Sequence, residues 1–415
     1  MSNNLLIKKP TQSIHFFYQP FLWNIIEAGA FQTILLLHQY FLYKTIMPES
    51  YGLTGVLLSF VYGTIYLCNT GLDGSIYRFF TEIKTKQKFY SIFALPFATQ
   101  LLLLSIIAPA ACLYFNLDNY LYILPALMCV EFTKKTLRTI LHCLLKNKYT
   151  TTLELLGIML YVSIIWTYYS YTKLLSPFFL LATLLFISSL QLPILIFLIF
   201  KWYQTLPLIN NKRTLTTSFY HIAYYRSIFS LYKIFPFIFS ANFLIPFIGW
   251  HYSLIHAASL KYVSHIYYFI YILLYKAFGN SIHTYLALTK QSFSSSKKAF
   301  FLKINTFLFF ILSLLFLAAF LAIGYNFYYQ TSMIKLYFFI LLLTESFLIN
   351  YERLCFIKDV LLYPIYIHMA VVIILAIILY SSTIQSLESI LLLCIALRIL
   401  SVAIIIRYAN YSTNE

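Results

Sequence analysis

The sequence predicts an all-α polytopic membrane protein of about twelve transmembrane helices in two six-helix bundles. Its 415 residues are 61% hydrophobic and only 10% charged, whereas a soluble globular domain carries about 25% charged residues. The mean hydropathy is +0.80, and apolar stretches long enough to cross a bilayer recur along the whole chain. These observations exclude a soluble globular protein.

Twelve apolar stretches can each form a membrane-spanning helix. Only the fourth is weakly apolar, because four charged residues interrupt its second half, and they fit a helix that extends past the bilayer or faces a polar interior; they are Glu131, Lys134, Lys135 and Arg138. The stretches lie at 21–43, 52–76, 90–114, 119–143, 152–172, 176–200, 229–250, 254–278, 300–324, 333–351, 359–381 and 386–406.

The longest interior polar stretch, residues 201–215, follows the sixth predicted span. It therefore predicts an N-terminal six-helix bundle over 1–200, a cytoplasmic linker over 201–215 and a C-terminal six-helix bundle over 216–415. The connections between the spans are short and leave no room for a catalytic domain outside the membrane.

The formal net charge of +17 is explained by topology. Loops rich in Lys and Arg alternate with loops that carry few or none, and basic loops stay on the cytoplasmic side. The alternation predicts a multi-pass protein of the cytoplasmic (inner) membrane with both termini inside, and it removes the need for a nucleic-acid partner. Residues 1–19 lack the order of a signal peptide.

Ionisable side chains inside spans are expensive, so they are candidates for function. Glu27 and His38 lie about 20° apart around the first predicted helix, beside Asn24. They predict a proton or cation site, or a partner for a cation in a cavity. A structurally paired carboxylate near the interface is the alternative.

The eighth predicted span carries Lys261, His265 and Lys276 at helical spacing on one face. A cationic face of this kind is suited to an anion such as a phosphate, although snorkelling or structural pairing would also explain it. Glu345 and Arg398 are further intramembrane charges. They are expected either to pair with each other or to contact substrate.

No motif indicates an enzyme, a cofactor or a metal site. The segment Asp73-Gly74 with Arg78 resembles the start of a phosphatidyl-alcohol transferase signature, but the further aspartates of that signature are missing. The six cysteines form no CxxC pair and are expected to be buried apolar side chains. No Walker loop, GxSxG or HExxH occurs in the chain.

Residues 30–80 read AFQTILLLHQYFLYKTIMPESYGLTGVLLSFVYGTIYLCNTGLDGSIYRFF. Pro48-Glu49, Tyr51-Gly52, Gly71-Leu72 and Arg78-Phe79 resemble the N-terminal region of Wzx-type polysaccharide flippases, in the multidrug/oligosaccharidyl-lipid/polysaccharide (MOP) exporter superfamily. The chain departs from that pattern at Met47, where the family usually has Gly. It also lacks the Asp-Arg often found after span seven and the usual Pro in span eight.

The resemblance implies translocation of a polyprenyl-pyrophosphate-linked oligosaccharide to the outer leaflet, by alternating access of two bundles around a cationic cavity. The implied partners are the lipid-linked oligosaccharide, membrane lipids and H⁺ or Na⁺. The candidate residues divide into a cationic substrate-binding set and an ion-coupling set. The first is Arg78, Lys261, Lys276 and Arg398; the second is Glu27, His38 and Glu345.

Three alternatives stay open. A cation-coupled multidrug exporter of the same superfamily would use Glu27. A membrane-embedded O-antigen polymerase or glycosyltransferase would need a large, charged outer loop, which the sequence does not contain. A scaffold without transport is the third.

Overall fold

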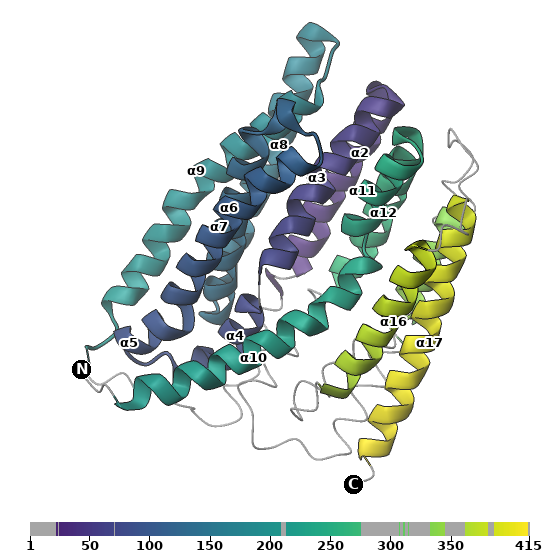
Figure 1. Cartoon of the computed structure of the whole chain (residues 1–415). Coiled ribbons are helices and arrows are strands. Elements are labelled where there is room, and N and C mark those ends of the chain that lie inside the picture. The colour runs from purple at the N-terminus through teal and green to yellow at the C-terminus, as the bar shows by residue number, and fades with distance from the viewer. Residues whose placement is uncertain are drawn as a thin grey trace.

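The computed structural model describes residues 22–23, 25–69, 71–208, 213–274, 333–344, 362–380 and 386–413, with four single positions between 307 and 314. Within these ranges every regular element is a helix, and Figure 1 shows long helices running roughly alongside one another. The chain is an all-α polytopic membrane protein, as the sequence predicts.

The N-terminal half, up to residue 208, alternates long helices with short connections. Three of its helices have proline at the first or second helical position, where the missing N–H costs nothing. These are α3, α6 and α9. The elements are η1 (Glu27–Phe31), α2 (Gln32–Thr45), α3 (Pro48–Cys68), α4 (Leu72–Phe79), η2 (Phe80–Glu82), α5 (Lys86–Phe89), η3 (Tyr90–Ala94), α6 (Leu95–Tyr114), η4 (Asp118–Tyr120), α7 (Ile123–Cys143), α8 (Asn147–Thr172) and α9 (Pro177–Gln204).

The C-terminal half, from residue 213, begins with α10, which crosses the lower part of the molecule in Figure 1. It packs against α4, α11 and α16, and α16 packs in turn against α17. The described elements are α10 (Arg213–Ile238), α11 (Ala241–His251), α12 (Leu254–Leu274), a helix over Met333–Thr344, α16 (Leu362–Tyr380) and α17 (Leu387–Thr413).

Two predicted spans are interrupted. The span expected at 52–76 ends at Cys68, and α4 begins after a break in which Gly71 adopts φ 72°. The Asn69 side-chain oxygen accepts a hydrogen bond from the Leu72 N–H at 3.1 Å, so it satisfies a free donor at the start of α4. The span expected at 229–250 is divided between α10, which ends at Ile238, and α11.

Five described helices are long and apolar enough to cross a membrane by length and composition. Several carry large exposed apolar side chains on their outer faces, including Leu102, Ile106, Ile196 and Phe197. In water such surfaces would be costly; in a bilayer they contact lipid. Most of the predicted ninth span, 300–324, lies outside the described residues.

Helix α3 lies between the two halves. It packs against α7 and α9 on one side and against α11 and α12 on the other. Any relative movement of the two halves therefore changes the surroundings of α3.

Candidate functional site

A buried network of charged side chains is centred on α7. Glu131, Lys134 and Arg138 follow one another at spacings of three and four residues, so they project from one face. The Lys134 ammonium lies 2.8 Å from Glu131 Oε1 and 4.0 Å from Glu154 Oε1 on α8. The polar-interior interpretation of the fourth span is confirmed for these residues.

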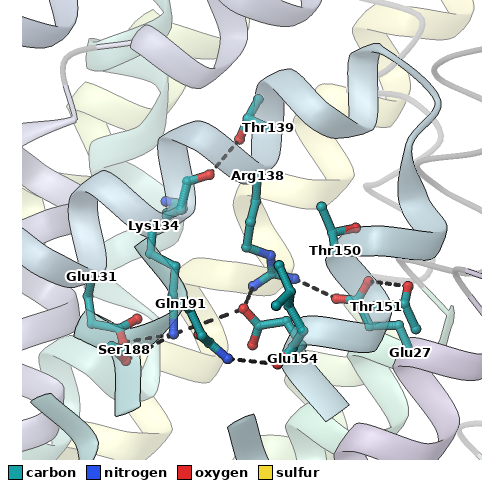
Figure 2. A network of polar contacts seen from close by, with 12 residues as sticks. Glu27, Glu131, Lys134, Arg138, Thr139, Thr150, Thr151, Glu154, Ser188 and Gln191 are labelled. Atoms are coloured by element: carbon teal, nitrogen blue, oxygen red, sulfur yellow. Dashed lines mark hydrogen bonds and ion pairs between the residues drawn. The ribbon is translucent and has the colours of Figure 1, made fainter. Parts of the chain in front are cut away.

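Arg138 joins three elements. Its Nη2 donates to Glu27 Oε1 at 2.6 Å, and its Nη1 lies 2.8 Å from Glu154 Oε1. The Thr151 hydroxyl donates to the second Glu27 oxygen at 3.2 Å. Figure 2 shows the guanidinium between the two carboxylates, so η1, α7 and α8 are held together through one side chain.

Helix α9 completes the network. The Ser188 hydroxyl donates to Glu131 and accepts from Lys134 at 3.2 Å, while the Gln191 amide donates to the Leu153 carbonyl at 2.7 Å. The helices approach closely here because Gly157 on α8 has no side chain where the Gln191 amide lies.

Five charged groups of the network lie among the described residues. Its three carboxylates are at most 7% exposed, and they face one ammonium and one guanidinium; the carboxylates are those of Glu27, Glu131 and Glu154. Fully ionised, these five described groups sum to 2 − 3 = −1. Glu27 and Glu154 also have partners besides these, so the sum describes these five groups alone.

Glu154 was missed by the sequence analysis, although a signal for it exists. Asn147, Thr150, Thr151 and Glu154 recur at helical spacing along α8 and are all buried. A polar face on an apolar helix of this length would have predicted that α8 faces a polar interior.

His38 faces α8, as Glu27 does, but it has different partners. The Trp166 indole N–H lies 3.3 Å from His38 Nδ1, and the Tyr161 ring packs edge-on at 5.2 Å between centroids. The imidazole is completely buried. The π-helical turn η1 separates the two candidate ion-coupling residues along the chain.

Lys261 is a buried cation between α12 and α3. It is 2% exposed, which shows that it does not snorkel to the interface. Its ammonium lies 4.1 Å from the centre of the Tyr51 ring and has no hydrogen-bond partner among the described residues.

The other predicted cations lie elsewhere. Arg398 on α17 is 1% exposed, with its guanidinium carbon 5.9 Å from the centre of the Phe239 ring. Arg78 on α4 is partly buried, 4.8 Å from the centre of the Tyr225 ring on α10. Lys276 and Glu345 lie outside the described residues, so the proposed pairing of Glu345 with Arg398 stays a prediction.

A transition-metal centre has no support in the described part of the chain, where no group of three or more His, Cys, Asp or Glu side chains could hold a metal ion. The five cysteines described are free and buried or partly buried.

Comparison with known proteins identifies the fold. No family model matches the chain, and no curated protein matches its sequence. A solved structure named protein A has a TM-score of 0.69 at 13% identity, with 97% of each chain covered. The eukaryotic MATE transporter AtDTX14 has a TM-score of 0.57 at 11% identity, covering 95% of this chain and 96% of its own.

A third solved structure is the outward-facing conformation of a multidrug resistance MATE family transporter of the MOP superfamily. It has a TM-score of 0.51 at 10% identity, covering 96% of this chain and 95% of its own. The chain therefore shares, over nearly its full length, the fold of MATE transporters. At these identities the likeness shows the fold and does not distinguish a flippase from a drug exporter.

Proposed function

We propose that the protein is a MOP-superfamily transporter that flips a polyprenyl-pyrophosphate-linked oligosaccharide across the cytoplasmic membrane for cell-surface polysaccharide biosynthesis. The two predicted halves, 1–200 and 216–415, would rock against each other around the linker at 201–215. The transporter fold and the flippase resemblance of residues 30–80 support this proposal. The single observation that carries it is the buried Lys261 ammonium.

An anionic ligand would compensate the buried positive charge of Lys261. Among the described residues, the Lys261 ammonium contacts an aromatic ring and has no hydrogen-bond partner. A cation–π contact offsets only part of the lost hydration, so the ammonium is poorly compensated there. A pyrophosphate supplies full negative charge and several acceptor oxygens. The nearby rings of Tyr43 and Tyr262, stacked at 4.6 Å, are of the kind that packs against sugars.

The test is flipping in proteoliposomes. A polyprenyl-pyrophosphate-linked oligosaccharide with a fluorescent label is protected from a membrane-impermeant quencher until it reaches the outer leaflet. The wild-type protein should accelerate quenching, and Lys261→Met should abolish the acceleration. Lys44→Met is the matched control, because Lys44 also lies over a tyrosine ring, at 5.9 Å from the centre of Tyr40, but is exposed.

Two outcomes would contradict the proposal. If the labelled lipid flips no faster in vesicles with the wild-type protein than in protein-free vesicles, the protein has no flipping activity toward it and the proposal is wrong. If the Lys44 and Lys261 variants lose flipping equally, the buried Lys261 ammonium has no specific role in transport.

The buried Glu27 carboxylate is a candidate for coupling to H⁺ or Na⁺, and it also supports a second candidate function, a cation-coupled multidrug exporter. Glu27 is the side chain that we assign to coupling, because it is 1% exposed and shares Arg138 with Glu154. Efflux of a cationic dye that requires a proton or sodium gradient and is lost in Glu27→Gln would favour the exporter. Gradient-dependent flipping lost in the same variant would favour the coupled flippase.

A further inference from the structure

The contact between Lys261 and Tyr51 is tightly constructed. Tyr51 is completely buried, and its hydroxyl donates to Gln39 Oε1 on α2 at 3.0 Å, which fixes the ring. The lysine stem fills the space beside Gly55, where an added Cβ would lie 2.7 Å from Lys261 Cδ. The aromatic face and the glycine together form a socket for one lysine side chain.

This socket lies within a longer contact between the halves, which we call the interhalf seam. It consists of the places where glycines of α3 and α4 meet α10, α11 and α12. The absent side chains allow backbone and ring atoms of the C-terminal half to approach closely. The contacts are Gly52 with Leu254, Gly55 with Lys261, Gly63 with Phe237 and Asn242, Gly71 with Arg226, and Gly74 with Phe229.

Among these seam contacts, that of Lys261 is the only one in which a buried ammonium lies over an aromatic ring of α3, the ring of Tyr51. A cation held on an aromatic face is stabilised by the ring quadrupole. An approaching phosphoryl group offers stronger, charge-assisted hydrogen bonds to the same ammonium. Because Lys261 is buried where the two halves meet, a phosphoryl group can reach its ammonium only when that contact loosens.

We infer that Tyr51 is a positioning residue that holds Lys261 while the interhalf seam is closed, and that an anionic ligand opens the seam by taking Lys261 from it. The identity of the ligand as a polyprenyl pyrophosphate rests on the proposed function. The competition itself requires only a phosphate-bearing amphiphile. In this way binding of cargo and separation of the halves are parts of one event.

The experiment measures the distance across the seam with spin labels. Met47, which is 72% exposed, and His251, which is exposed at the end of α11, are replaced by cysteine and labelled in the full chain. The parent chain without added cysteines measures labelling of native thiols. Geranyl pyrophosphate is the probe, and geraniol tests whether the lipid tail alone has an effect.

The wild-type protein should show a short distance that lengthens with geranyl pyrophosphate and not with geraniol. Tyr51→Leu should lower the closed-to-open ratio about tenfold to thirtyfold without any ligand, the size expected for loss of a desolvated cation–π contact. Tyr51→Phe keeps the ring and should stay near the wild-type ratio. In Lys261→Met the probe should leave the distance unchanged.

Overturning results are equally specific. A Tyr51→Leu protein that matches wild type, or a Lys261→Met protein that still opens with the probe, would refute the inference. These results are separable from the flipping assay. If the protein fails to flip the lipid-linked oligosaccharide but shows the expected distance changes, the inference about Lys261 and Tyr51 stands and only the proposed cargo is wrong.

Discussion

Removal of the Arg138 guanidinium is the strongest test of the buried charge network. Arg138 contacts Glu27 at 2.6 Å and Glu154 at 2.8 Å, and Arg138→Gln would leave three buried carboxylates facing one ammonium. The formal charge would change from −1 to 1 − 3 = −2. Loss of one partner from a buried ion pair costs about 3–5 kcal/mol, so this variant should be among the least stable single substitutions in the N-terminal half.

The assay is thermal unfolding of purified protein in detergent, followed by the loss of monodisperse protein. Lys135→Gln is the matched control, because the next lysine of α7 is 44% exposed and pairs with Asp73 at 3.2 Å. A pair of that exposure contributes about 0–1 kcal/mol. The reasoning is wrong if Arg138→Gln melts no earlier than this control.

A second substitution separates charge balance from lost hydrogen bonds. Glu154→Gln alone gives 2 − 2 = 0 and keeps an amide that can accept from Arg138, so it should destabilise far less than Arg138→Gln. The double variant returns the formal charge to 1 − 2 = −1 and should melt above Arg138→Gln, with a coupling of about 0.5–3 kcal/mol. Further loss of stability in the double variant would refute the charge argument.

Two further predictions concern topology and packing. A reporter fused after Asp118 should appear outside and one fused after Lys298 inside; the reverse at either point would overturn the assigned orientation. Gly52→Ala should destabilise by about 1–3 kcal/mol, because the new methyl would meet the Leu254 carbonyl of the backbone. Gly157→Ala should cost less in the same melting assay, since its tightest contact would be the end of the Gln191 side chain and not backbone; equal losses would contradict this difference.

Apolar periodicity was sufficient to predict the fold class and the positions of most helices described. Length and hydropathy report whether a segment prefers lipid to water, and that preference changes little with tertiary context. Breaks in the backbone are different, because Asn69 and Gly71 produce one through a local hydrogen bond and a positive φ. Because the surrounding residues are apolar, the mean hydropathy over a window of about twenty residues stays high and does not reveal such a break.

The site was only partly predictable. Spacing alone placed Glu27, Lys261 and Arg398 within the membrane, and the structure buries all three. Which charges meet depends on contacts between helices distant in sequence, such as Arg138 with Glu27. A single sequence contains no direct record of those contacts, so the pairing with Arg138 and Glu154 was missed.

The arrangement of charge between the halves has a consequence for transport. Among the described residues, the buried acids Glu27, Glu131 and Glu154 lie in the N-terminal half together with the buried Lys134, whereas Lys261 and Arg398 are buried in the C-terminal half. In the proposed function the first set takes up H⁺ or Na⁺ and the second set takes up a pyrophosphate. Helix α3 contacts both α7, which carries Arg138, and α12, which carries Lys261, so in the proposed function a movement of α3 against α12 would link the two uptakes.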